Sequence, residues 1–326
     1  MAEPAPAGSA PARRLLSGDP SARLRRRHWR RYWIRDPLFG ALDFALLFGC
    51  RMLPIRWCSA IGGILGILNA RYRFHTVRER ARRGYAALSG ARPSAAETDR
   101  AVMRLFDNLG RVMLEFAVLD RLWPAGRISI TGAEHFLAAR AGGKPVLVMA
   151  VHLGNWEVIA PTMIALLPGV KGAGFYQPPR SRFEHKLAVA ARRRYGGTMF
   201  PVGVAGARMA HRLLVDEQGV LLVYVDEERK GEVSAPLFGR PIPRRANLLA
   251  IIRLAWASGA AIVPAYAERL PGARFRVTYL PPVELLGPAG DPAAALVANA
   301  QRLDQVITPL VLDHLDQWYM LVEYRG

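Results

Sequence analysis

The chain has 326 residues and a mass of 36.0 kDa, which suits one large α/β domain with extensions or two smaller domains. Hydrophobic residues make up 51% and charged residues 22%, a composition that excludes a chain disordered throughout. Two cysteines, Cys50 and Cys58, exclude a disulfide scaffold and a thiolate zinc cluster, and they predict a reducing compartment. The net charge of +19 predicts an anionic partner, which can be nucleic acid, acidic lipid or an acidic protein.

Residues 1–35 are predicted to form a disordered basic leader. The first eleven residues are Ala, Pro, Gly and Ser with one acid, and nine arginines follow between Arg13 and Arg35. Trp29, Tyr32 and Trp33 interleave with those arginines, a composition typical of a segment at an anionic membrane surface. A solvated basic tail is the alternative.

Residues 36–75 are predicted to be a membrane-associated helical segment. The apolar stretch is interrupted by charges at Asp43, Arg51 and Arg56, so no run reaches the roughly 20 residues that span a bilayer. Two helices over 38–48 and 57–68, separated by a proline, fit a hairpin or interfacial helices in one leaflet. A buried helical pair is the alternative. No signal-peptide pattern is present, so the body is expected in the cytosol.

Residues 76–326 are predicted to form one α/β domain on a largely buried sheet, because short β-rich runs alternate with helical ones. The predicted strands are 127–131, 145–150, 171–176, 219–225, 261–265 and 274–280. The predicted helices are 76–88, 94–119, 185–195, 205–217, 245–258 and 293–314.

Several common sites are absent from the sequence. It contains no G-x-S-x-G elbow, no G-x4-G-K-[ST] loop and no G-x-G-x-x-G turn. The closest histidines, His135 and His152, are 17 residues apart, so no helix carries a zinc-binding pair. These absences exclude α/β-hydrolase, P-loop and zincin chemistry.

The candidate catalytic residues follow an apolar strand that ends at His152. Gly154 permits a tight turn there, and Glu157 lies five positions after the histidine. On a continuous helix these two residues would lie about 140° apart, so they can meet only across such a turn. Glu157 can then accept the Nδ1 hydrogen of His152 and leave Nε2 free as a general base. With no serine beside them, the nucleophile would be a hydroxyl of the substrate. A histidine held by a carboxylate for stability alone is the alternative.

The segment from Val151 to Glu157 resembles the His-x4-Asp/Glu block of the lysophospholipid acyltransferase superfamily, in the form used by bacterial lipid A late acyltransferases (lauroyl and myristoyl transferases). Further blocks resemble that family in order and spacing over about residues 40–324: Tyr176-Gln177-Pro178; Arg192 with Arg194-Tyr195-Gly196-Gly197; Asp226-Glu227-Glu228; Pro236-Leu237-Phe238-Gly239-Arg240-Pro241; and Ile262-Val263-Pro264.

The resemblance implies a glycerol-3-phosphate-acyltransferase-like fold, with a central mixed sheet flanked by helices and with N-terminal membrane-associated helices. It also implies acyl transfer to a hydroxyl of a lipid A precursor, with no metal or redox cofactor. The acyl donor would be an acyl carrier protein or coenzyme A thioester. His152 would remove the acceptor proton, and Glu157 would orient His152 and balance its charge. Arg192 or backbone N–H groups would stabilise the oxyanion.

The remaining site residues are expected to contact the substrates: Asn155, Trp156, Tyr176, Arg194, Asp226 and Glu228. Asp226 and Glu228 can also serve as a second carboxylate contact to His152, or form a structural salt bridge to a nearby arginine.

The resemblance places the protein on the cytoplasmic face of the inner membrane. Its expected partners are an anionic glycolipid acceptor and an acyl carrier protein, both compatible with the positive charge, and no nucleic acid. Two alternatives stay open. The acceptor can be another glycolipid, such as a phosphatidylinositol mannoside, or the chain can be a non-catalytic basic protein that binds a membrane or a nucleic acid.

Overall fold

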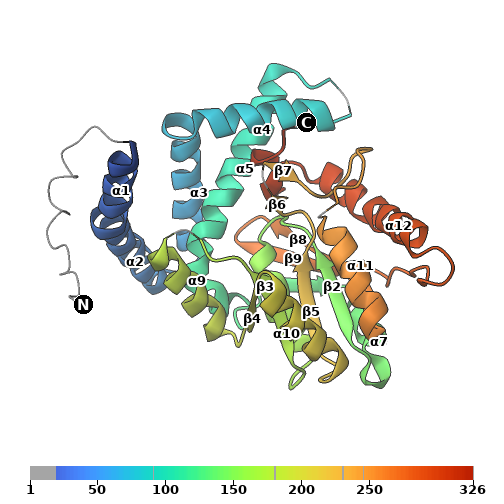
Figure 1. Ribbon diagram of the computed structural model, residues 1–326. Helices are drawn as coiled ribbons and strands as arrows, with labels where there is room; N and C mark the ends of the chain where they lie inside the picture. The colour runs from blue at the N-terminus through green and yellow to red at the C-terminus, as the bar shows by residue number, and fades with distance from the viewer. Residues whose placement is uncertain (1–19, 91, 180, 230, 245, 326) are drawn as a thin grey trace, which may run out of the picture.

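A seven-stranded mixed sheet forms the centre of the computed structural model, which describes residues 20–90, 92–179, 181–229, 231–244 and 246–325 (Figure 1). Its strands are β1 (Ile128–Thr131), β2 (Val146–Ala150), β3 (Gly172–Tyr176), β4 (Met199–Pro201), β5 (Val220–Tyr224), β8 (Ala261–Leu270) and β9 (Arg274–Tyr279). The strand order is β1-β9-β8-β2-β5-β3-β4. All neighbours are parallel except β8 and β9, which form an antiparallel hairpin.

The predicted fold class of a mixed sheet flanked by helices is therefore confirmed, and all six predicted strands are present. Strand β4, an edge strand of three residues that ends in a proline, was not predicted. Nor was the short hairpin of β6 (Glu228–Arg229) and β7 (Glu232–Val233). Both are too short to show a periodic pattern in sequence.

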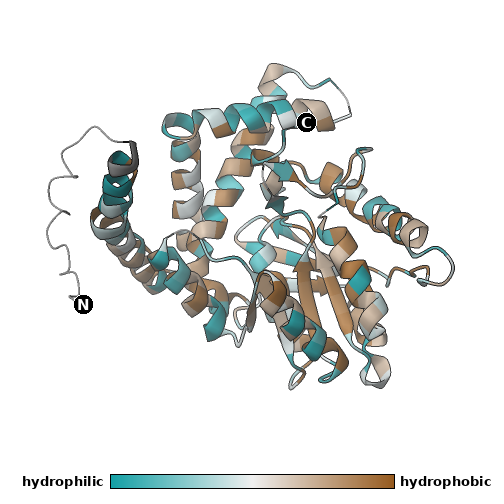
Figure 2. Cartoon of the chain, in the orientation of Figure 1, coloured by the Kyte–Doolittle hydropathy of each residue, from teal (hydrophilic) through white to brown (hydrophobic). Residues whose placement is uncertain are grey.

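The sheet is covered on both faces, which explains why its central strands are apolar throughout. Along β2, Leu147 and Met149 belong to one hydrophobic cluster, whereas Val146, Val148 and Ala150 belong to another. Successive strand residues point to opposite faces, so each cluster occupies one face of the sheet. Figure 2 shows the strands as the most hydrophobic part of the chain.

Helices supply much of both clusters. The helices are α1 (Pro20–Arg30), α2 (Asp36–Met52), α3 (Ile55–Tyr72), α4 (His75–Leu88), α5 (Ala95–Glu115), α6 (Leu119–Leu122), α7 (Ala133–Ala139), α8 (Ile159–Leu166), α9 (Arg182–Arg194), α10 (Val204–Val215), α11 (Asn247–Ser258) and α12 (Pro292–Asp313). Buried residues of α10, α11 and α12 pack in the first cluster, and those of α7 and α8 pack in the second.

Helix α3 is tied to α5 by close backbone contact between glycines. A Cβ atom on Gly66 would lie 2.1 Å from the carbonyl oxygen of Phe106, and one on Gly110 would lie 2.2 Å from that of Gly62. No side chain fits between the two helices at these positions. Helix α3, the second helix of the predicted hairpin, is therefore packed into the body of the protein. For this helix the structure agrees with the alternative of a buried helical pair.

Helix α2 is different, because much of its apolar surface is exposed. Leu38 is 68% exposed, Phe48 71% and Met52 74%. Among the described residues, no helix is both long and apolar enough to cross a membrane.

The prediction of a disordered leader over residues 1–35 is wrong for residues 20–35. Helix α1 and the π-helical turn η2 (Arg31–Arg35) lead directly into α2. Arginine is a good helix former, and this intrinsic preference outweighs the charge density that suggested a leader. Residues 1–19 lie outside the described residues.

Candidate active site

The site is built on the loop that follows β2 and carries His152. Gly154 has a φ of +60°, and a Cβ atom there would lie 2.3 Å from the carbonyl oxygen of Ala267, so the turn requires glycine. The side chain of Asn155 then accepts a hydrogen bond from the backbone N–H of Glu157 (3.2 Å) and starts the short helix η5 (Trp156–Val158). The predicted turn between His152 and Glu157 is present.

The partner of His152, however, is Asp226, which the sequence offered only as a second carboxylate contact to this histidine. Its Oδ1 lies 2.8 Å from His152 Nδ1, and its Oδ2 accepts the backbone N–H of His152 at 2.8 Å. The prediction that Glu157 accepts the Nδ1 hydrogen is therefore wrong. The register of the sheet explains the pairing: Ala150 in β2 lies opposite Tyr224 in β5, so the residues two positions further on meet beyond the strand ends.

Asp226 is completely buried, and each of its described hydrogen-bond partners is a nitrogen. Besides the two bonds from His152, the indole N–H of Trp318 donates to Oδ2 at 2.9 Å. An ionised carboxylate can only accept hydrogen bonds, so Nδ1 of His152 must carry the hydrogen and Nε2 has a free lone pair. The geometry thus leaves a basic nitrogen on a histidine that is 14% exposed.

Aromatic rings enclose the imidazole. The ring of Tyr224 stacks on it with centroids 4.3 Å apart, and Trp156 meets it edge-on at 5.2 Å. Tyr319 lies in the C-terminal segment that follows α12 (residues 314–325). It stacks on Trp156 at 5.3 Å, and its backbone N–H donates to the carbonyl of His152 at 2.8 Å. Burial raises the pKa of Tyr224 well above its ordinary value, so its hydroxyl stays protonated and donates to the carbonyl of Trp156.

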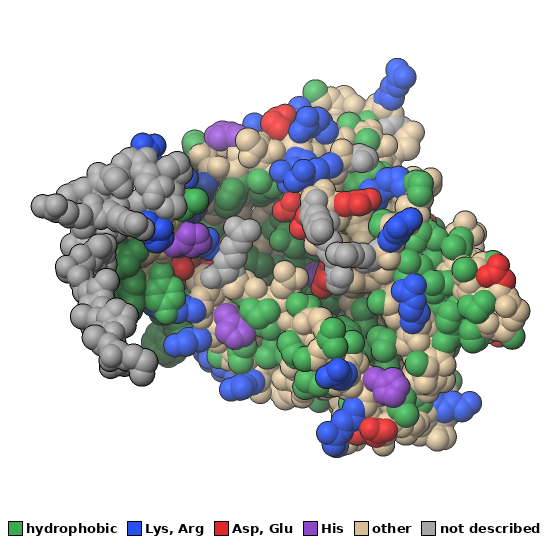
Figure 3. Space-filling view, in the orientation of Figure 1, with side chains coloured by type: hydrophobic (Ala, Val, Ile, Leu, Met, Phe, Trp, Pro, Cys, Tyr) green, Lys and Arg blue, Asp and Glu red, His purple; other side chains and the backbone are tan. Residues whose placement is uncertain are grey.

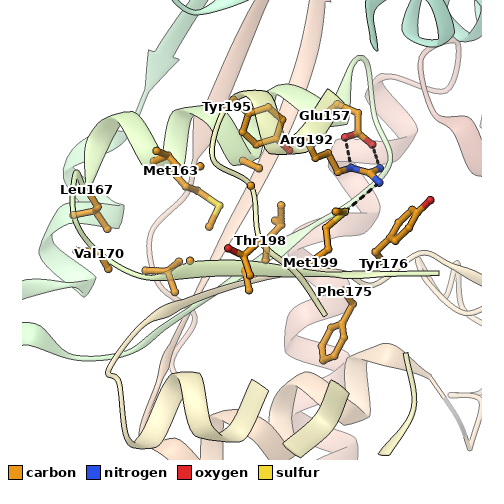
Figure 4. Close-up of a pocket in the computed structure, with 18 of the residues that line it drawn as sticks. Glu157, Met163, Leu167, Val170, Phe175, Tyr176, Arg192, Tyr195, Thr198 and Met199 are labelled. Atoms are coloured by element: carbon orange, nitrogen blue, oxygen red, sulfur yellow. Dashed lines mark hydrogen bonds and ion pairs between the residues drawn. The ribbon is translucent and has the colours of Figure 1, made fainter. Parts of the chain in front are cut away.

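Glu157 instead forms a two-point ion pair with Arg192. Nη2 of Arg192 lies 2.6 Å from Oε1, and Nε lies 3.0 Å from Oε2 (Figure 4). Burial opposes the charge on the guanidinium, but the Glu157 carboxylate outweighs it and raises the pKa of Arg192. Because both side chains are largely buried, the pair is a fixed part of the site and not a solvated contact.

An apolar pocket begins at this ion pair. It extends between α8 and the strands β3, β4 and β5, and Figure 4 shows Glu157 and Arg192 at one end and Leu167 and Val170 at the other. The pocket contains about 730 Å³ of unfilled space, including its open side. Tyr224 lines it as well, so the ring that stacks on His152 also forms part of the pocket wall.

Three of the other predicted residues lie at the site or directly beside it. Tyr176 lines the pocket, with the Arg192 guanidinium 4.7 Å above its ring. Trp156 borders His152 and donates to Glu157 at 3.2 Å. Asn155 is buried, so its contacts are to protein and not to solvent.

Two predicted residues lie outside this arrangement. Arg194 is exposed and does not line the pocket. Glu228 is exposed on β6, where its carboxylate accepts the backbone N–H of Gly231, and it makes no described contact with His152.

A buried polar network that was not predicted supports the loop carrying His152. Glu115, fully buried near the end of α5, accepts from Asn155 Nδ2 at 2.7 Å and pairs with Arg269 at 2.6 Å and 2.7 Å. The backbone N–H of Arg269 donates to Gln317, the residue before Trp318. One buried ion pair therefore fixes both the His152 loop and the C-terminal segment. No local sequence pattern predicts this network, because its members come from four distant parts of the chain.

Among the residues that the structure describes, no group of three or more His, Cys, Asp or Glu side chains is arranged to hold a metal ion.

Comparison with known proteins gives two matches. Residues 25–323 match the family model described as bacterial lipid A biosynthesis acyltransferase. The chain is also similar to a lipid A biosynthesis acyltransferase of Haemophilus influenzae (strain ATCC 51907 / DSM 11121 / KW20 / Rd). It is 23% identical over 284 residues, covering 85% of this chain and 84% of that protein.

Proposed function

Because the chain belongs to the bacterial lipid A biosynthesis acyltransferase family and is thus an acyltransferase, we propose that it acylates a hydroxyl of a lipid A precursor. The acyl donor in this proposal is a thioester of acyl carrier protein or coenzyme A. The observation that carries the proposal is the His152–Asp226 pair, which leaves a basic nitrogen on a histidine whose stacking partner, Tyr224, lines the apolar pocket.

His152 acts as the general base. Its Nε2 takes the proton of the acceptor hydroxyl as the oxygen attacks the thioester carbonyl carbon. Asp226 keeps Nδ1 protonated and stabilises the imidazolium that forms. When the tetrahedral intermediate collapses, the carbon–sulfur bond breaks and the imidazolium returns the proton to the thiolate. Atoms and charge balance with no cofactor.

The fatty acyl chain occupies the apolar pocket in this proposal. Its wall is formed by aliphatic side chains of α8 and by small residues of β3. A mostly apolar cavity with a few polar groups at one end is the usual architecture for such a ligand. The polar end holds Glu157 and Arg192 and lies next to Tyr224, which stacks on His152.

Arg192 supplies the oxyanion contact in the same scheme. Glu157 engages its Nε and Nη2, whereas the closest partner of Nη1 is the sulfur of Met199 at 3.9 Å. Nη1 therefore retains hydrogens for the developing charge on the carbonyl oxygen. Glu157 then serves to orient Arg192, and it does not charge-balance His152.

The N-terminal helices bring the enzyme to the cytoplasmic face of the inner membrane in our proposal. Exposed apolar residues of α1, η2 and α2 include Trp29, Trp33, Leu38 and Phe48. Figure 3 shows hydrophobic and basic side chains interleaved over these helices. Aromatic rings with arginines suit the headgroup region of an anionic bilayer. The same positive charge would attract an acidic carrier protein.

Purified enzyme tests the function directly. Wild type, His152→Ala and Arg208→Gln are incubated with a long-chain acyl thioester of carrier protein and with lipid A precursor, and the lipid products are measured by mass spectrometry. Arg208 is an exposed residue of α10, so its replacement controls for purification and charge loss. The expected result is one added acyl group with wild type and with the control, and none with His152→Ala.

Acylation of another glycolipid, but not of lipid A precursor, would keep the mechanism and refute the acceptor. If no lipid is acylated and the thioester stays intact, while the protein binds vesicles or RNA, the non-catalytic alternative is correct. Membrane association is read separately, by flotation with vesicles of phosphatidylglycerol and phosphatidylethanolamine. Replacing Trp33 and Phe48 together by glutamate is expected to abolish it.

A further inference from the structure

A second cleft lies between α4 and the C-terminal segment, outside the pocket at Arg192. It is lined by Arg80, Arg83, Tyr324 and Arg325. The three guanidinium groups repel one another, and an anion bound between them would relieve that repulsion.

One of the three arginines is fixed by the protein. Nη1 of Arg80 donates to the carbonyl of Val322 at 3.0 Å and to Glu323 Oε2 at 2.8 Å. Among the described residues, no carboxylate is within ion-pair distance of Arg83 or Arg325. Counting Glu323, the lining has a net charge of +2, from three arginines and one carboxylate.

The cleft is joined to the catalytic residues through the C-terminal segment. Tyr324 lines the cleft, and its ring lies 6.3 Å from that of Trp318, which donates to Asp226. On the other side, a Cβ on Gly231 would lie 3.1 Å from the Arg325 guanidinium, so the β6–β7 hairpin after Asp226 supports that arginine. A ligand bound in the cleft thus contacts the segments that also form the site around His152.

We propose that this cleft binds a phosphate monoester of the acceptor lipid and so positions the hydroxyl to be acylated. A phosphate monoester carries a charge of about −1.5 to −2 near pH 7, which matches the +2 of the lining. A phosphodiester, such as the one in a phosphopantetheine thioester, carries only one negative charge. Arginine pairs with phosphate oxygens through two parallel hydrogen bonds, and the cleft offers two arginines with no described acidic partner.

The inference rests on the proposed function, and two variants test it. Arg83→Gln/Arg325→Gln removes both of these charges. Arg208→Gln/Arg253→Gln is the matched control, because it removes two exposed charges on α10 and α11. Acylation kinetics are measured with phosphorylated lipid A precursor and with the same lipid after phosphatase treatment.

We expect the first variant to raise KM for the phosphorylated acceptor by about tenfold or more. Its KM for the thioester and its KM for the phosphatase-treated acceptor should stay close to wild type. The control should match wild type throughout. An equal KM increase with both acceptors, an increase for the thioester instead, or no change would each overturn the proposal.

A binding measurement separates this inference from the proposed function. With His152→Ala as background, binding of phosphorylated lipid A precursor in detergent is followed by the change in tryptophan fluorescence. The phosphate site predicts a Kd about tenfold higher when Arg83 and Arg325 are also replaced, whether or not the wild type acylates this lipid. Equal Kd values with and without the two arginines would refute the site, even if the wild type proves to be active.

Discussion

Replacement of Asp226 by Asn tests which carboxylate supports the catalytic histidine. In the wild type, Oδ2 of Asp226 accepts two hydrogens, from the His152 backbone and from the Trp318 indole, and Oδ1 faces His152 Nδ1. Asparagine has one acceptor oxygen, and the two donors fix it on the Oδ2 side. The amide NH₂ then faces Nδ1 and favours the tautomer in which Nε2 carries the hydrogen.

The magnitude follows from this change of tautomer. With hydrogen on Nε2, the imidazole cannot take the proton from the hydroxyl of the acceptor lipid. The general-base contribution is then lost, which lowers kcat by a factor of roughly 10²–10⁴. The substitution preserves volume, and all of the donors keep a partner or face a neutral group, so the fold should be retained. Glu157→Gln is the matched comparison. It weakens the Arg192 ion pair without touching His152, so we expect a smaller loss of kcat, of roughly tenfold.

The assay is single-turnover acylation with saturating thioester, combined with ¹⁵N NMR of labelled histidine to identify the tautomer of His152. Thermal denaturation of each variant verifies that it is folded. The reasoning is refuted if Asp226→Asn retains more than a tenth of wild-type kcat while Glu157→Gln is inactive. It is also refuted if the NMR tautomer of His152 is unchanged in Asp226→Asn.

Four further substitutions test the packing and the ion pairs of the fold. Gly110→Ala should destabilise the protein by about 1–3 kcal/mol in urea denaturation, because its Cβ would lie 2.2 Å from a carbonyl of α3. Gly49→Ala, which has no atom within 4 Å, should be neutral or slightly stabilising. Glu115→Gln leaves the arginine of the buried pair uncompensated, and should cost about 3–5 kcal/mol in the same measurement. The Arg51 hydrogen bond lowers the pKa of Asp120 below 3.8, so this contact stabilises the fold above that pH and is lost as the pH falls through the native pKa. Asp120→Asn should therefore be less stable than wild type at pH 6 by about 1 kcal/mol, with the difference disappearing in acid.

The sequence predicted the elements of the sheet because their signals are local. A buried strand such as 146–150 is recognisable from its own apolar residues, and the predicted and observed strands agree to within a residue at most ends. The exception is β8, which continues to Leu270 with a glutamate and an arginine in its second half. There the chain pairs with β9, where Glu268 lies 3.7 Å from Arg276, and Arg269 forms the buried ion pair with Glu115 of α5. Each charged residue therefore has a partner that its own segment does not show.

The pairing of His152 needed information that is not local. Glu157 is five residues away and Asp226 is 74 residues away, so the nearer carboxylate was the natural choice from sequence. The turn at Gly154 does bring Glu157 back toward the strand ends, but there it meets Arg192 on α9. A guanidinium that offers two parallel hydrogen bonds is a stronger partner for a carboxylate than a neutral imidazole. The contact of Glu157 with the distant Arg192 therefore replaces the expected contact with the nearby His152.

Neighbouring strands nevertheless contain a usable signal. Predicted strands 145–150 and 219–225 both end shortly before a polar residue, His152 in one and Asp226 in the other. If the two strands are parallel neighbours in register, these residues must meet beyond the edge of the sheet, and the register of β2 with β5 satisfies that condition. The two acidic groups of the site then have separate tasks. Asp226 sets the proton of the histidine, and Glu157 holds the arginine at the end of the pocket. Each task can be removed by a substitution that leaves the other pair intact.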